Sequence, residues 1–151
     1  MPDRATLGGA ATDGDAERAA QARETVGLRL REAHYPGRAP IDAYGDGGFR
    51  FAGMSHRGAL LCLPSGIYGW NVGTFDALTP ADFAKVAGEG DLELLIVGAG
   101  TELRPVPRTI REALADHGVR TEPMSTGAAV RTLNVLLAED RPVGAALLPV
   151  D

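Results

Sequence analysis

Residues 92–100 read LELLIVGAG, an apolar run that ends in a glycine-rich turn. Consecutive Leu, Ile and Val residues over this length are typical of a strand that is buried on both faces of a sheet. After the turn, Pro107 opens a helical pattern that ends near His117, with Gly118 as its stop. The stretch therefore predicts a strand followed by a helix, which is the repeating unit of α/β folds.

The alternation continues toward the C-terminus. Val119–Glu122 is a short strand pattern, and Ser125-Thr126-Gly127 starts a helix that runs to about Glu139. Val143–Val150 is a further apolar run, which predicts the last strand. Upstream, Thr79-Pro80-Ala81-Asp82 has the residues of a helix start with a capping box.

Strands dominate the earlier part of the chain. Ile41–Tyr44 and Phe49–Ala52 flank a Gly-Asp-Gly-Gly turn and predict a hairpin, and Ala59–Leu63 and Ile67–Val72 read as two more strands. We therefore expect an α/β fold: a single compact domain with a mixed, partly parallel β-sheet, helices packed on it, and an N-terminal hairpin region before it.

Residues 1–38 differ from the rest and are expected to form an N-terminal extension. Residues 1–14 are small and polar, which is typical of disorder. Residues 15–33 are rich in Ala, Arg and Glu and predict a helix with only a thin apolar stripe. Proline and glycine at 36, 37 and 40 then break the chain, so we place the α/β domain at residues 39–151.

Composition excludes several classes of function. The net charge is −5 with no basic stripe, which argues against nucleic-acid binding. No apolar run approaches the ~20 residues of a membrane span. A lone cysteine and an acidic N-terminus without an apolar signal core predict a cytoplasmic protein.

The usual catalytic patterns are incomplete. Gly98-Ala99-Gly100 follows a strand, but position 103 is Leu instead of the third glycine of a dinucleotide fingerprint. The three histidines are far apart in sequence, and Cys62 lies in an apolar run typical of a buried thiol. We therefore expect no metal, no cofactor and no catalytic residue, and we lean against an enzyme.

One polar stripe points to a binding site. On the helix from Gly127, Arg131 and Asn134 share a face opposite the apolar one, and Thr126 lies at the helix N-terminus, where backbone amides attract anions. With the turn after the buried strand, these residues could form a pocket for a carboxylate or phosphate. Its candidate residues are Gly98, Gly100, Thr101, Thr126, Arg131 and Asn134. Alternatively, Arg131 ties the helix to neighbouring groups and has a structural role only.

Two aromatic residues give a second candidate surface. Strand alternation places Tyr68 and Trp70 on one face. This pair is either part of the core or an exposed aromatic interface.

Four segments of the chain carry a family resemblance: IDAYGDGGFRFAG (41–53), HRGALLCLPSGIYGW (56–70), LELLIVGAGTELRPVP (92–107) and EPMSTGAAVRTLNVLLAEDRPVGAALLPV (122–150). In these segments the chain resembles a family of small domains of uncharacterised function. That family includes the mitochondrial complex I assembly factor 3 and the adipogenesis-associated proteins. The resemblance implies a compact α/β fold and no established activity.

Two functional hypotheses follow from the resemblance and the polar stripe. The resemblance implies a non-catalytic assembly or interaction factor in respiratory complex I biogenesis, whose partners are complex I subunits or assembly proteins. The alternative is a protein or enzyme that binds a small anionic ligand in a pocket around Arg131.

Overall fold

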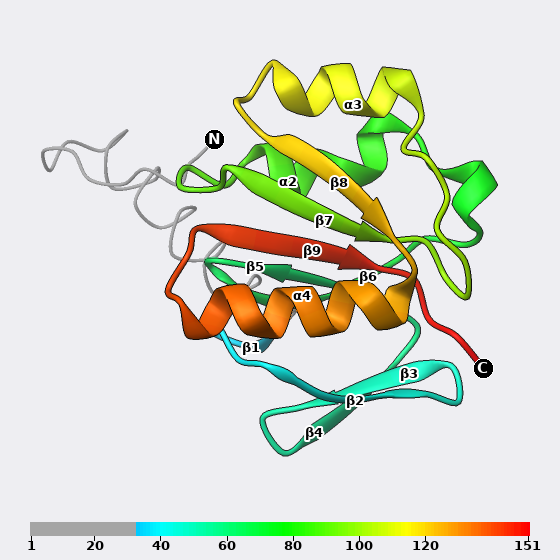
Figure 1. Ribbon diagram of the computed structural model, residues 1–151, viewed down its shortest axis with the longest axis vertical. Helices are drawn as coiled ribbons and strands as arrows, with labels where there is room; N and C mark the ends of the chain where they lie inside the picture. The colour runs from blue at the N-terminus through cyan, green and yellow to red at the C-terminus, as the bar shows by residue number, and fades with distance from the viewer. Residues whose placement is uncertain (1–32) are drawn as a thin grey trace, which may run out of the picture.

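The computed structural model describes residues 33–151, which form two β-sheets with helices packed around them (Figure 1). The larger sheet has the strand order β1-β6-β5-β9-β7-β8. Its strands are β1 Ala33–Tyr35, β5 Ala59–Leu63, β6 Gly66–Trp70, β7 Leu94–Gly98, β8 Arg120–Met124 and β9 Val143–Leu147. The smaller sheet contains β2 Ile41–Gly45, β3 Gly48–Phe51 and β4 Met54–Arg57. The helices are α2 Ala84–Ala87, α3 Arg108–Ala115 and α4 Thr126–Ala138, with 3₁₀ helices η1 Phe75–Ala77 and η2 Pro80–Phe83.

The larger sheet is mixed. Strand β7 pairs in parallel with both β8 and β9, whereas β5 pairs antiparallel with β6 and β9, and β1 pairs antiparallel with β6. The two parallel neighbours of β7 are reached through helical crossovers, as parallel pairing requires. The expected α/β fold with a mixed, partly parallel sheet is therefore confirmed.

Buried side chains divide into two cores, one on each face of the larger sheet. One core packs beneath η1, η2, α2 and α3 and includes Leu95, Val97 and Ile110. The other includes Ile96 and Leu133 and is closed by α4 together with the inner face of the smaller sheet. Figure 1 shows the smaller sheet (cyan) at one end of the molecule and α3 (yellow) at the other.

The strands of the smaller sheet are connected by tight turns whose residues adopt positive φ values. Asp46 and Gly47, between β2 and β3, have φ values of 51° and 78°. Positive φ at both central residues matches the twist of a tight hairpin and favours Asp-Gly. The predicted hairpin is therefore confirmed. A second turn at Ala52 and Gly53 repeats the positive φ and leads into β4. This strand was not predicted because MSHR has no apolar alternation.

The predicted helix starts keep their capping chemistry. The Thr79 backbone N–H donates to Asp82 Oδ2 at 2.8 Å and closes the capping box of η2, although this segment begins as a 3₁₀ helix before becoming α2. The Ser125 hydroxyl accepts from the Ala128 backbone N–H at the start of α4.

The N-terminal expectations are only partly within the described residues. The predicted helix at 15–33 lies outside them, except for Ala33, which belongs to β1. Because β1 pairs with β6, the larger sheet includes residues before the predicted domain boundary at 39.

Candidate functional site

The predicted polar cluster begins where α4 crosses the end of β7. A Cβ atom at Gly98 would lie 3.0 Å from Leu147 Cδ2, 3.1 Å from Ala129 Cβ and 3.1 Å from Thr126 Cα. Such distances are shorter than ordinary van der Waals contact. Gly98 therefore permits α4 to pack directly on the sheet.

Thr126 is fully buried at this junction, with 0% of its surface exposed. Its hydroxyl donates to the Leu148 carbonyl at 2.7 Å and accepts from the Gly100 backbone N–H at 3.0 Å. These bonds join α4 to the chain after β9 and to the turn after β7. The buried hydroxyl therefore has both a donor and an acceptor partner within the protein, as a buried polar group requires.

Asn134 ties α4 to the smaller sheet. Its side-chain Nδ2 donates to the Ile41 carbonyl and its Oδ1 accepts from the Ile41 backbone N–H, each at 2.9 Å. This paired contact fixes the first residue of β2 on α4, so the structure gives Asn134 a clear structural role.

The predicted polar stripe of Arg131 and Asn134 is only partly covered in the structure. Asn134 is half-buried beneath β2, but Arg131 is exposed one turn earlier on the same helix. The reason is that Tyr44 of β2 fills the space beside Gly127: a Cβ there would lie 2.4 Å from the Tyr44 hydroxyl oxygen and 3.6 Å from Arg131 Nη1. Thr101 is exposed as well. The structure thus separates a packed junction at Gly98, Gly100 and Thr126 from an exposed Arg131, and anion binding by these residues stays a prediction.

The aromatic pair belongs to the core. Tyr68 and Trp70 are only 4% and 7% exposed. The indole Nε1 of Trp70 donates to the Asp82 carbonyl at 2.8 Å, and its ring meets Phe83 edge-on with centroids 5.2 Å apart. Of the two alternatives for this pair, the structure shows the place in the core, where almost no ring area is left exposed.

Cys62 is buried in β5, as its apolar neighbours predicted. Burial raises the pKa of its thiol to about 12, because the thiolate would be desolvated there. The group is therefore a neutral core side chain at physiological pH.

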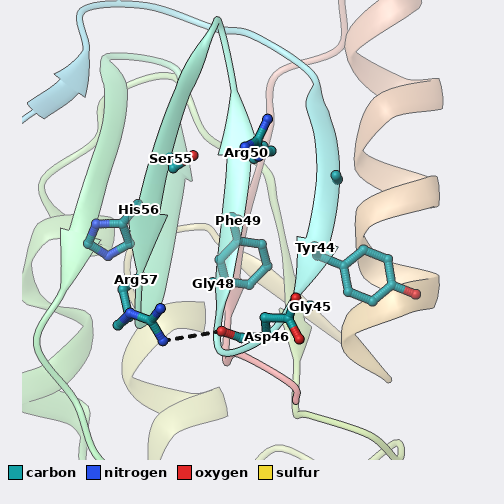
Figure 2. Close-up of a pocket in the computed structure, with 10 residues that line it drawn as sticks. Tyr44, Gly45, Asp46, Gly48, Phe49, Arg50, Ser55, His56 and Arg57 are labelled. Carbon is teal, nitrogen blue, oxygen red and sulfur yellow. Dashed lines mark hydrogen bonds between the residues drawn. The ribbon is translucent and has the colours of Figure 1, made fainter.

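A groove of about 500 Å³ lies on the outer face of the smaller sheet (Figure 2). Pairing places six of its ten lining residues in two cross-strand rows, because neighbours in register share a face. The rows are Ala43-Arg50-Ser55 and Gly45-Gly48-Arg57. The opposite face of the same sheet carries Phe49 and Phe51, which are buried in the core.

Two arginines give this groove its charge. Within residues 33–151 no hydrogen bond or ion pair reaches the exposed Arg50 guanidinium. Arg57 is also exposed, and its Nη1 donates to the Asp46 carbonyl at 3.3 Å (Figure 2). The Asp46 side chain brings one carboxylate to the rim. The groove therefore carries a positive excess on a chain whose net charge is −5.

The groove was not predicted from the sequence because its residues come from three strands, one of which was itself not predicted. The usable signal was the alternation of Arg50 with Phe49 and Phe51, which places the arginine opposite the core. Joining it to Arg57 needs the register of β3 and β4, which depends on the turn at Ala52 and Gly53.

Two further findings concern the described part of the chain as a whole. Its helices are all too short or too polar to cross a membrane. Its His, Cys, Asp and Glu side chains form no group of three or more that could hold a metal ion.

The fold and the groove together define a small α/β domain with an open, arginine-bearing face on its outlying sheet. The chain belongs to the protein family of unknown function DUF498/DUF598, whose model matches residues 41–148.

Two kinds of protein are similar in sequence to this chain. An uncharacterized protein of Rhodobacter capsulatus is 44% identical over 120 residues, which cover 80% of this chain and 92% of that protein. The human NADH dehydrogenase [ubiquinone] 1 alpha subcomplex assembly factor 3 is 32% identical over 128 residues, which cover 84% of this chain and 68% of the human protein.

Solved structures share the fold. The crystal structure of a protein described as an outer membrane protein of Bartonella henselae is 54% identical, with a TM-score of 0.75. It covers 78% of this chain and 100% of its own.

Proposed function

We propose that this chain is a non-catalytic assembly factor that binds protein partners on the cytoplasmic side during biogenesis of respiratory complex I. The observation that carries the proposal is the similarity to assembly factor 3, which extends over 84% of this chain in the human protein. The family model matches residues 41–148, which include the smaller sheet, α4 and every strand of the larger sheet except β1.

The arrangement of polar groups is consistent with a binding module. The polar side-chain atoms of Thr126 and Asn134 form hydrogen bonds that hold α4 against the two sheets. In contrast, Arg50 and Arg57 stand on an open face where a partner protein can reach them. Exposed arginines are common at protein interfaces, where they form directed contacts with carboxylates and carbonyls.

The proposal is tested by deleting the gene in its source organism and measuring assembled complex I on native gels. We expect the amount of assembled complex I to fall and to return when the full chain is supplied again. The other respiratory complexes serve as the control and are expected to stay unchanged. Complex I at its normal level in the deletion strain, under conditions that require the complex, would overturn the assembly function.

A further inference from the structure

The outer face of the smaller sheet has the geometry of a surface for an extended chain. Its side chains form the two rows Ala43-Arg50-Ser55 and Gly45-Gly48-Arg57. Rows that alternate along a strand are spaced by two residues, or about 7 Å. Arg50 and Arg57 lie in adjacent rows on adjacent strands, so they are diagonal neighbours on this face, and both are exposed to solvent.

Small residues keep the face low around these arginines. Ala43, Gly45 and Gly48 contribute at most a methyl group, and a Cβ at Gly48 would lie 2.4 Å from the His56 carbonyl oxygen. Glycine at that position therefore lets β4 approach β3 closely. The result is a shallow floor of backbone and small side chains, open along one side because β4 is the last strand of its sheet.

The positive charges of Arg50 and Arg57 indicate the chemistry of a partner that would bind this face. Two arginine side chains on diagonal positions of one face repel each other, and opposite charges across strands relieve such repulsion. Asp46 does not do so through an ion pair, because its contact with Arg57 uses the backbone carbonyl. A partner that supplies carboxylates at the spacing of the rows would neutralise both guanidinium groups.

The shape favours a protein segment over other anions. A free phosphate needs an enclosing set of donors, whereas these guanidinium groups are exposed on an open groove. A nucleic acid needs a broad basic surface, whereas this groove has two arginines on a chain with a net charge of −5. An extended peptide places alternate side chains on one side at about 7 Å, which matches the rows.

We propose that the outer face of β2, β3 and β4 binds an extended acidic segment of a partner protein, with carboxylates on alternate residues contacting Arg50 and Arg57. This inference rests on the proposed function as an assembly factor, because it names the surface and the partner chemistry through which that function acts. Ser55 is the cross-strand partner of Arg50 and lies two residues before Arg57 on the edge strand β4, so its hydroxyl lies beside the bound segment.

The test is a titration of the full chain into a fluorescein-labelled ten-residue peptide in which Glu alternates with Thr, followed by anisotropy at low salt. The matched neutral peptide has Gln in place of Glu. The groove variant combines Arg50→Glu with Arg57→Glu. The control variant combines Arg111→Glu with Arg120→Glu, which changes the net charge equally at exposed arginines of α3 and β8.

We expect the acidic peptide to bind the wild-type chain and the control variant, and to bind the groove variant about ten-fold more weakly. Binding should also weaken as salt rises. Equal affinity of the groove and control variants, or equal affinity for the Gln peptide, would overturn the inference. Absence of peptide binding by the wild-type chain would overturn it as well. Circular dichroism and thermal unfolding establish that both variants fold.

The same variants separate this inference from the proposed function when they are returned to the deletion strain. Complex I restored by the control variant and not by the groove variant supports both. Complex I restored equally by both variants keeps the assembly function and rejects the groove as its surface. If deletion itself leaves complex I unchanged, the assembly function fails, and the peptide titration alone then decides whether the groove binds acidic segments.

Discussion

The junction of α4 with β7 and the outer face of the smaller sheet contain similar residue types but use them in opposite ways. Both combine glycines with hydroxyl-bearing side chains. At the junction, neighbouring atoms fill the space that Gly98 leaves, and the Thr126 hydroxyl is fully hydrogen-bonded. On the outer face, Arg50 has no bonded partner within the described residues and the surface is open.

The difference shows which features of a residue identify a site in this fold. A glycine or threonine beside a strand end is compatible with either role, so residue type alone does not decide between them. The deciding property is whether the polar atoms are already bonded and whether the space is already occupied. By that criterion the junction holds the domain together, and the outer face is available for binding.

The largest effect is expected from filling the junction with Gly98→Val. The new side chain would overlap Leu147 and Ala129, and overpacking of a tight interior costs about 2 to 3 kcal/mol. The free energy of unfolding, measured by urea denaturation, should fall by that amount. Gly73→Val is the matched control, because nothing lies within 4 Å of a Cβ at Gly73. Equal stability of the two variants would mean that α4 does not pack as tightly on β7 as described.

A smaller loss is expected from Thr126→Val, which keeps the shape and removes the hydroxyl. The Leu148 carbonyl and the Gly100 N–H would lose their partner, and unsatisfied buried groups of this kind cost about 2 kcal/mol in total when one of them can still reach water. Gly100 is half-buried, so its N–H is that group. Urea denaturation again measures the loss, and Thr126→Ser should retain most of the wild-type stability. If Thr126→Ser is as unstable as Thr126→Val, the methyl group is the more important contact.

The sequence predicted the layered fold well because local signals agreed there. Three kinds of signal specify a local conformation without help from the rest of the chain. They are the apolar run around Ile96, the capping residues Thr79 and Ser125, and the Asp46-Gly47 turn. Strand β4 was missed because its four residues carry no apolar alternation, and its place depends on the turn before it.

The candidate site was harder to predict for a different reason. Helical periodicity placed Arg131 and Asn134 on one stripe, but periodicity cannot state which part of the stripe another element covers. The smaller sheet covers Asn134 and leaves Arg131 exposed. Likewise, Arg50 and Arg57 meet on one face only through the register of β3 with β4, which is a property of the folded chain.

The smallest expected effect comes from Gly127→Ala, which examines the border between the two regions. Gly127 lies in the first turn of α4, where alanine is favoured over glycine by up to about 1 kcal/mol. The new methyl group would displace the Tyr44 hydroxyl, which is the far end of an exposed side chain and can turn away at little cost. We therefore expect urea denaturation to show a stability equal to the wild type or about 0.5 kcal/mol higher, while the NMR signals of the Tyr44 ring shift. A loss larger than 1 kcal/mol would show that Tyr44 is fixed against α4. In that case the position of the smaller sheet, and with it the groove, would depend on Gly127 as much as on the paired bonds of Asn134 to Ile41.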